Sequence, residues 1–357
     1  MVRTEPAGQV TTTSASETEE PPVRIPFGQR TRDRWILGIG AFVIALVLCL
    51  LIWGPEMGFY TTVTTEQSSD GSMTFDVSAR EVVADSIDAF VSWLTLEASW
   101  AFDTLSTGVT YALVYIENVL TWTPWPAVVV GLCLLAFAVG RWALTGFTLF
   151  ALMFIGILDL WGNTMDTVAL MVVAVAVSVS IGLPIGIVGA RSRFADNLMR
   201  PILDGMQTMP SFVYLLPGIL FFGLGKPAGI FATILYATPP VIRLTNLGIR
   251  QVSPSVVEAA RAFGSSPWQT LAKVQIPMAL PTIMAGINQT TMMALAMVTI
   301  ASLVAAGGLG DNVNRALQRN EPGNGLLAGL AIVFLAIVID RLTQSIAARR
   351  TEAVTAG

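Results

Sequence analysis

The stretch EAARAFGSSPWQTLAKVQIPMALP, residues 258–281, is a polar segment between two long apolar runs, residues 228–247 and 278–305. An apolar run of about 20 residues is long enough to cross a bilayer as a helix. Over the whole chain 54% of residues are hydrophobic and only 12% are charged, with a mean hydropathy of +0.67. So little charge cannot solvate the surface of a soluble protein. The chain is therefore predicted to be an all-α polytopic membrane protein, with this stretch in one of its loops.

The loop itself carries the signals of two short helices. Each helix is expected to begin at a serine–proline pair, because serine caps free N–H groups and proline suits the first turn: Ser253-Pro254 and Ser266-Pro267. Gly264 can take the left-handed conformation that ends a helix, and Gln269 is placed for a capping box. The second helix is expected to end near Ile276-Pro277, with Pro281 near the start of the next span. Two helices joined by a glycine elbow form a compact knob, which is either an element that inserts into a partner or an ordinary turn.

Eight apolar runs are candidate spanning helices: 35–53, 126–140, 142–160, 164–190, 208–224, 228–247, 278–305 and 324–346. Only Arg141 separates the second run from the third, which suggests a tight hairpin. With the N-terminus placed inside, four basic residues fall outside, Arg80, Lys226, Arg315 and Arg319, and the other sixteen of the 20 fall inside. This positive-inside bias predicts that both termini and the 258–281 loop are cytoplasmic.

The chain divides into four predicted regions. Residues 1–30 are rich in Thr, Ser, Glu and Pro and are expected to be a disordered cytoplasmic tail. Residues 31–125 hold the first span and an outside segment, residues 126–350 the transmembrane domain with the cytoplasmic loop 250–277, and residues 351–357 a second cytoplasmic tail.

The outside segment, residues 54–125, has an amphipathic pattern. Its apolar residues fall at helical spacing: Ile87, Phe90, Val91, Leu94, Ala98 and Ala101. Its tryptophans suit the headgroup level of a membrane: Trp93, Trp100, Trp122 and Trp125. A helix in the interface is predicted, and the tryptophans form either an aromatic belt or a substrate-binding cage.

The loop resembles the EAA loop of ABC-importer permeases, by which a membrane subunit engages its ATPase. The matching residues are Glu258, Ala259, Ala260 and Gly264, followed by Ile276 and Pro277. The likeness extends over about residues 160–346 and is closest to permeases of glycine betaine, proline betaine and choline importers, whereas the first 125 residues show little of it. Further matching segments are Leu203–Tyr214, Pro239–Thr245, Pro281–Thr290, Gly307–Gly310 and Asp340–Gln344.

The resemblance implies a type I importer permease in a bacterial plasma membrane that imports glycine betaine or a related osmolyte. The implied partners are a second copy of this chain, two ATPase subunits that bind ATP and Mg, and an extracytoplasmic binding protein. The chain itself is expected to bind no cofactor, metal or nucleic acid and to be no enzyme. It has no histidine, and Gly223–Pro227 is not a P-loop because Pro227 stands where a Ser or Thr would hold magnesium.

Polar residues inside spans are costly unless they face a bundle interior or a water-filled path. Two polar patches are therefore candidates for the translocation path: Gln207, Thr208, Phe212 and Tyr214, and Asn288, Gln289 and Thr290. Phe212 and Tyr214 could offer cation–π surface to a quaternary ammonium group. The alternative for each residue is packing or hydrogen bonding between helices.

Three other functions stay open from the sequence. The first is a permease of the same machinery for another solute, such as methionine or another amino acid. The second is an ion-coupled secondary transporter, which needs an ionisable residue deep in a span, whereas its candidates lie near predicted span ends: Asp159, Asp166, Asp204 and Asp340. The third is a membrane scaffold that transports nothing.

Overall fold

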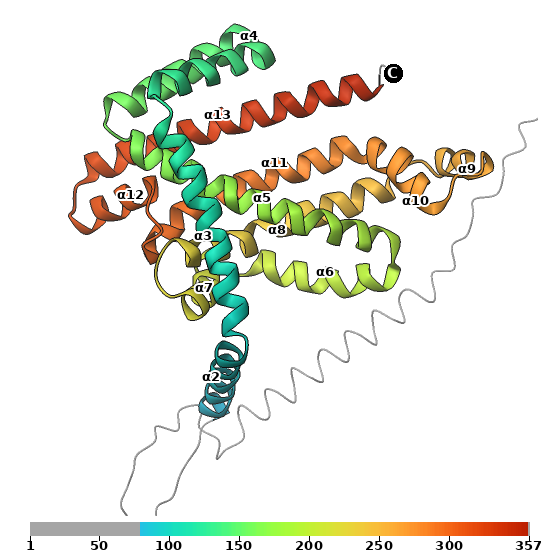
Figure 1. Ribbon diagram of the computed structural model, residues 1–357, viewed down its shortest axis with the longest axis horizontal. Helices are drawn as coiled ribbons and strands as arrows, with labels where there is room; N and C mark the ends of the chain where they lie inside the picture. Colours follow the sequence, from blue (N-terminus) through green and yellow to red (C-terminus); the bar gives the residue numbers. More distant parts are fainter. Residues whose placement is uncertain (1–78, 356–357) are drawn as a thin grey trace, which may run out of the picture. The chain divides into compact units, whose positions relative to one another are not determined.

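The computed structural model describes residues 79–355. The predicted tail at 1–30 and the predicted span at 35–53 lie outside these residues. Contacts divide the chain into two units, Met1–Asp88 and Ala89–Gly357, and the account below concerns the second. Every regular element in the described range is helical (Figure 1): α2 (Ala79–Glu97), α3 (Ser99–Trp122), α4 (Trp125–Ile157), α5 (Trp161–Arg191), α6 (Arg193–Thr208), the 3-10 turn η1 (Ser211–Tyr214), α7 (Leu215–Phe222), α8 (Lys226–Arg250), α9 (Pro254–Ala262), α10 (Pro267–Thr270), the π-turn η2 (Leu271–Gln275), α11 (Ile276–Ala301), the 3-10 turn η3 (Ser302–Val304), α12 (Leu309–Gln318) and α13 (Pro322–Thr355).

Four helices in the described range are long and apolar enough to cross a membrane: Trp161–Arg191, Lys226–Arg250, Pro267–Val304 and Pro322–Ser345. They correspond to the predicted runs 164–190, 228–247, 278–305 and 324–346. Two further pairs of helices qualify only if each bent pair is counted as one span, which gives up to six. The all-α polytopic fold is therefore confirmed.

The two runs around Arg141 together form α4, which folds back on itself. A straight helix of its 33 residues would be about 50 Å long. Trp125 at its start and Ile157 at its end nevertheless line the same cavity. The suggested hairpin is thus confirmed, and both arms contact α13, since Ala136 and Ala151 share one apolar cluster with Val338.

The predicted span 208–224 is wrong as a single helix. α6 ends at Thr208, and the pair of α6 with Ser211–Phe222 is bent by 111°. The cause is Pro210, because a proline disfavours helical geometry in the residue before it. Met209 accordingly has an extended backbone, with φ −68° and ψ 137°.

Helix α8 lies at the centre of the bundle, packed between α5 and α11. Glycines allow the close approach on both sides. A Cβ atom on Gly186 of α5 would lie 2.8 Å from the carbonyl oxygen of Ile242, and one on Gly286 of α11 would lie 2.9 Å from Cβ of Leu244. The pair Gly182 and Gly186 is therefore a helix-packing motif, as small residues at this spacing are in many membrane proteins.

Different elements lie at the two ends of the bundle. At one end the start of α8 meets the end of α11, where the Gly225 N–H donates to the Val304 carbonyl at 2.8 Å. Beside it the Leu309 N–H of α12 donates to Thr167 Oγ1 of α5, also at 2.8 Å. Lys226 starts α8 at this end, whereas α9 and α10 lie at the other end (Figure 1). The loop 258–281 is thus separated from Lys226 by the length of the bundle.

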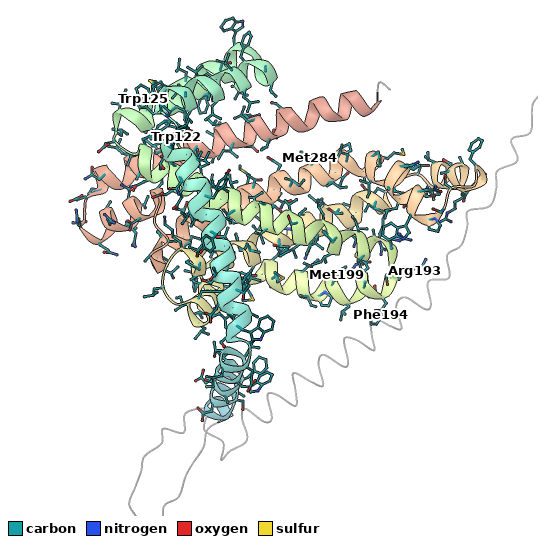
Figure 2. The ribbon with its side chains drawn as sticks, viewed as in Figure 1. Trp122, Trp125, Arg193, Phe194, Met199 and Met284 are labelled. Carbon is teal, nitrogen blue, oxygen red and sulfur yellow. The ribbon has the colours of Figure 1, made fainter. Side chains whose placement is uncertain are left out.

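Helix α3 runs across α5 and α8 rather than along them (Figure 1). Its Leu113 is buried in the main apolar cluster, and its Glu117 forms an ion pair with Lys226 at 2.6 Å. Trp122 is 88% exposed and lies with Trp125 at the junction of α3 and α4 (Figure 2). From Ala79 onwards the predicted helical character of the segment 54–125 is confirmed, although Ala98 interrupts it and makes two helices, α2 and α3, and residues 54–78 lie outside the described residues. Its place in the membrane interface stays a prediction.

Candidate functional site

The first helix of the 258–281 loop, α9, begins as predicted. Ser253 is its N-cap residue and Pro254 occupies its first turn. The Ser253 side chain makes no capping bond, however, because its hydroxyl pairs instead with the Ser255 hydroxyl at 2.8 Å. Proline therefore carries the start signal here, through its fixed φ and its missing N–H.

Gly264 is the elbow between α9 and α10. Its φ of +82° is in the left-handed region. The Ser265 N–H donates to the Ala260 carbonyl at 3.1 Å, and the Gly264 N–H donates to the Arg261 carbonyl at 2.9 Å. These two bonds form a Schellman motif, in which the last free carbonyls of a helix are satisfied by the turn that follows. The predicted role of Gly264 in the backbone is thus confirmed.

The second helix, α10, begins with a complete capping box. The Gln269 N–H donates to Ser266 Oγ at 3.3 Å, and the Ser266 N–H donates to Gln269 Oε1 at 2.8 Å. Pro267 occupies the first turn. Because both ends of the elbow are fixed by local hydrogen bonds, the knob is a preformed shape rather than a flexible linker.

The predicted end of this helix near Ile276-Pro277 is wrong. The chain continues through the π-turn at Leu271–Gln275 directly into α11, where the Ile276 N–H donates to the Leu271 carbonyl. A π-turn shifts the hydrogen-bond register by one residue, which lets the helix accommodate Pro277 with its missing N–H. Pro281 likewise lies inside α11. The knob is therefore joined to a spanning helix without a break.

The outer face of the knob exposes two aromatic side chains that the sequence reasoning missed. Phe263 is 91% exposed and Trp268 is 69% exposed, one on each side of Gly264. Glu258 and Ala259 are exposed on α9, and Ala260 is half-buried. The available signal was a large apolar residue placed next to the elbow glycine of an otherwise polar loop. Exposed aromatic residues of this kind are typical of protein interfaces.

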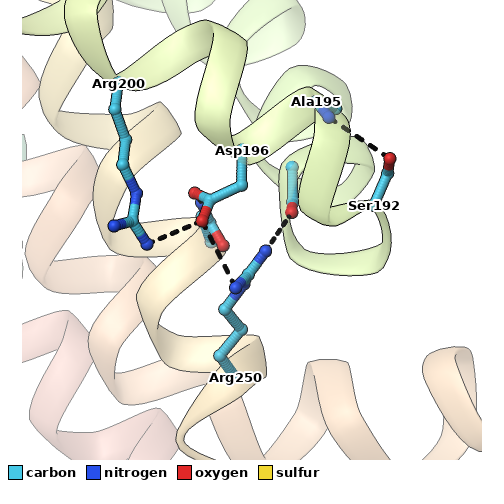
Figure 3. Close-up of polar contacts among 7 residues, drawn as sticks. Ser192, Ala195, Asp196, Arg200 and Arg250 are labelled. Carbon is cyan, nitrogen blue, oxygen red and sulfur yellow. Dashed lines mark hydrogen bonds and ion pairs between the residues drawn. The ribbon is translucent and has the colours of Figure 1, made fainter. Parts of the chain in front are cut away.

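A buried ionic network, also missed from the sequence, fixes the turn between α5 and α6 to α8 (Figure 3). Asp196 is only 4% exposed and accepts hydrogen bonds from Arg200 at 2.6 Å and Asn246 at 2.7 Å. Arg250 lies 3.3 Å from the same carboxylate and donates to the Gly189 carbonyl at 2.8 Å. A buried carboxylate needs such partners because desolvation of an isolated charge is very costly. Arg250, one member of this network, lies three residues before the N-cap residue Ser253, so the network fixes the base of the knob.

The first predicted path patch is split by the break at Pro210. Gln207 and Thr208 are exposed at the end of α6, and Phe212 is 61% exposed. Tyr214 is buried, its hydroxyl donates to the Met206 carbonyl, and its ring packs edge-on against Tyr236.

The three residues of the second patch, on α11, have different surroundings. Asn288 donates to Asp340 of α13 at 3.0 Å, and its own amide oxygen accepts from Thr343. Gln289 is exposed, and Thr290 is fully buried with no hydrogen-bond partner for its hydroxyl among the described residues. The contacts place Asn288 between α11 and α13 and Tyr214 among residues packed on Met297, so the structure does not join the two patches into one site.

Comparison with known proteins identifies the family of the chain. Residues 182–352, which include the whole knob, match the family described as binding-protein-dependent transport system inner membrane component. The chain is 50% identical over 205 residues to the glycine betaine/carnitine transport permease protein GbuB of Listeria monocytogenes, covering 57% of this chain and 73% of that one. The chain belongs to this family.

Two further relatives and one solved structure are also similar to it. The glycine betaine/proline betaine transport system permease protein ProW of Escherichia coli is 44% identical over 71% of this chain and 74% of its own length. The glycine betaine transport system permease protein OpuAB of Bacillus subtilis is 42% identical over 76% of this chain and 96% of its own length. A chain of the inward-facing MetNI methionine ABC transporter is 24% identical, with a TM-score of 0.47 over 53% of this chain and 93% of that chain.

Family membership confirms the predicted resemblance. The chain is a multi-pass protein of the plasma membrane and the membrane component of a transport system, not an enzyme. Transport by such a system is driven by a separate ATPase and depends on a substrate-binding protein.

Proposed function

We propose that this chain is the permease subunit of an ATP-driven importer for glycine betaine or a related quaternary-ammonium osmolyte, such as proline betaine or choline. The observation that carries the transport mechanism is the preformed knob at residues 254–270, joined without a break to α11. The observation that favours this cargo is the set of relatives, whose names refer to glycine betaine, carnitine and proline betaine.

The knob is proposed to be the surface that binds the ATPase. Phe263 and Trp268 project from it on both sides of the elbow. Aromatic anchors of this kind, once buried in a partner's cleft, supply much of the binding energy of an interface. Closure of the ATPase around ATP and Mg would displace the knob. Because α10 passes through the π-turn into α11, and α11 packs on α8, that displacement would move the core of the bundle.

The proposed assembly contains two copies of this chain, two ATPase subunits and an extracytoplasmic binding protein. Both termini and the loop 250–277 are proposed to be cytoplasmic. In support of this, α12, which contains Arg315 and is followed by Arg319, lies at the end of the bundle away from α9 and α10 (Figure 1), and the loop and the helix ends near it are rich in arginine. The segment 31–125 is proposed to lie on the opposite side of the membrane after one span, and residues 126–350 to form the transmembrane domain.

The translocation path is proposed to follow the break in the fifth predicted span. Gln207, Thr208 and Phe212 are exposed there, and the Phe212 ring suits contact with a passing quaternary ammonium group. Gln289 is exposed on α11, whereas Tyr214, Asn288 and Thr290 are held in contacts between helices and are proposed to shape the path rather than to line it.

The test is uptake by proteoliposomes that contain this chain, its ATPase and its binding protein. We expect ATP-dependent uptake of glycine betaine that excess proline betaine or choline reduces and methionine does not. Uptake of an amino acid instead would overturn the cargo, and uptake driven by an ion gradient without the ATPase would favour a secondary transporter. Phe263→Ala should lower the amount of ATPase that co-purifies, with Phe194→Ala as the matched control, since Phe194 on α6 is also largely exposed, at 79%.

A further inference from the structure

The end of helix α5 touches the knob through a ring contact. Arg191, the last residue of α5, lies with its guanidinium carbon 4.8 Å from the ring centre of Trp268 on α10. This is the geometry of a cation–π contact, in which a cation is attracted to the negative face of an aromatic ring. Arg191 thus connects the knob to a helix that is distant from it in the sequence.

The turn that follows Arg191 is held firmly against α8. Ser192 caps α6 by accepting from the Ala195 N–H at 3.2 Å, and Asp196 is bound by Arg200, Asn246 and Arg250 (Figure 3). Gly189 lies so close to α6 and α8 that a Cβ atom there would overlap the Met199 side chain and lie 3.3 Å from Asn246. A push on Arg191 would therefore move the start of α6 and not merely a side chain.

On the knob side, the backbone that carries Trp268 is held in place. α10 starts at a capping box, and Thr270 and Leu271, which follow Trp268, are each only 2% exposed. Leu271 packs with Ile249 of α8 and Ala190 of α5. One face of the Trp268 ring meets Arg191, while the side chain as a whole stays 69% exposed and available to the ATPase.

We propose that Arg191 is a positioning residue that transmits movement of the knob to the turn between α5 and α6, in parallel with the direct route through the π-turn into α11. This inference rests on the proposed function. Helix α6 leads into the break at Pro210, where the exposed polar residues of the proposed path lie. The Arg191–Trp268 contact therefore links ATPase movement to the part of the bundle that is least regular.

The experiment compares uptake per ATP hydrolysed in proteoliposomes that hold the complete transporter. The variants are Arg191→Gln, Arg191→Lys, Trp268→Leu and the double variant Arg191→Gln with Trp268→Leu. Arg193→Gln is the matched control, because Arg193 is exposed at the start of α6, two residues away, and makes no ion pair or ring contact among the described residues (Figure 2).

An exposed cation–π contact changes an equilibrium by about two- to fivefold, so we expect Arg191→Gln to lower uptake per ATP by about that factor. Arg193→Gln should leave uptake per ATP unchanged. Arg191→Lys keeps the charge and should retain most of the wild-type uptake per ATP. The double variant should be no worse than Trp268→Leu alone, since both changes remove the same contact.

Two results would overturn the inference while leaving the proposed function intact. One is that the wild type shows ATP-driven betaine uptake and Arg191→Gln has the same uptake per ATP as the wild type. The other is a double variant whose losses multiply, because the two residues would then act independently. Absence of ATP-driven uptake by the wild type would instead refute the proposed function, and the inference with it.

Discussion

Replacing Gly264 tests whether the elbow geometry is what couples the knob to its partner. Gly264 has a φ of +82°, and a Cβ atom added there would meet nothing within 4 Å. Gly264→Ala would therefore destabilise the elbow only through the left-handed backbone of the alanine, by about 1–2 kcal/mol. Proline cannot take this conformation at all, because its ring holds φ near −65°. It would also remove the N–H that donates to the Arg261 carbonyl.

We expect Gly264→Pro to abolish stimulation of ATP hydrolysis by the loaded binding protein while the chain still inserts into the membrane. Gly264→Ala should lower the stimulated rate by a factor of about 5 to 30 at most, which is what 1–2 kcal/mol allows if the elbow must form before the ATPase binds. Co-purification of the ATPase and the stimulated rate would be measured in nanodiscs. Normal stimulation in Gly264→Pro would show that the elbow is not a coupling element, and the proposed mechanism would fail.

Three other substitutions test the packing that supports the knob. Gly186→Val should destabilise the protein by about 1–3 kcal/mol, because the new side chain would separate α5 from α8. Thermal unfolding would measure this loss, with Gly156→Val as the control, since a Cβ atom on Gly156 meets nothing within 4 Å. Asp196→Asn should cost about 1.5–3 kcal/mol through lost charge-assisted hydrogen bonds, and an unchanged melting temperature would contradict the network. Glu117→Gln should loosen α3 by about 1 kcal/mol or less, seen as faster amide exchange confined to α3.

The sequence predicted those parts of the site that depend on local backbone chemistry. The starts of α9 and α10 and the elbow at Gly264 are set by residues within one or two turns, so capping rules could find them. The apolar runs predicted the four long spanning helices for the same reason, since each run is long enough by itself.

The effect of each proline could not be predicted in this way. Pro210 ends a helix, whereas Pro277 and Pro281 are absorbed into one, and Pro239 and Pro240 lie inside the buried middle of α8. In every case the proline leaves a carbonyl without its usual donor, and the outcome depends on what else can satisfy or accommodate it. At Pro277 a shift of hydrogen-bond register suffices, and that shift has no sequence pattern of its own.

Contacts between distant segments were the other part that the sequence left open. Asp196 at the start of α6 accepts a hydrogen bond from Asn246 and forms an ion pair with Arg250, each of which lies 50 or more positions further along the chain. Nothing near Asp196 in the sequence distinguishes it from a solvated carboxylate, because its burial is produced by the approach of α8. The same holds for Arg191, whose partner Trp268 lies on another element.

The distribution of close contacts suggests how the bundle can move. Helices α5, α8 and α11 meet through glycines whose neighbours are backbone or first side-chain atoms, such as the Ile242 carbonyl beside Gly186. Interfaces this close cannot slide without clashes, so these three helices are expected to move as one block. The chain between Thr208 and Phe212 has no glycine contact of this kind, since it is already broken at Pro210 and exposes Phe212. A displacement applied to the knob should therefore appear as a change in the angle between α6 and α7, with the α5–α8–α11 block unchanged. Distance measurements between spin labels on α6 and α7, compared with a pair on α5 and α8, would test this, and a change confined to the second pair would refute it.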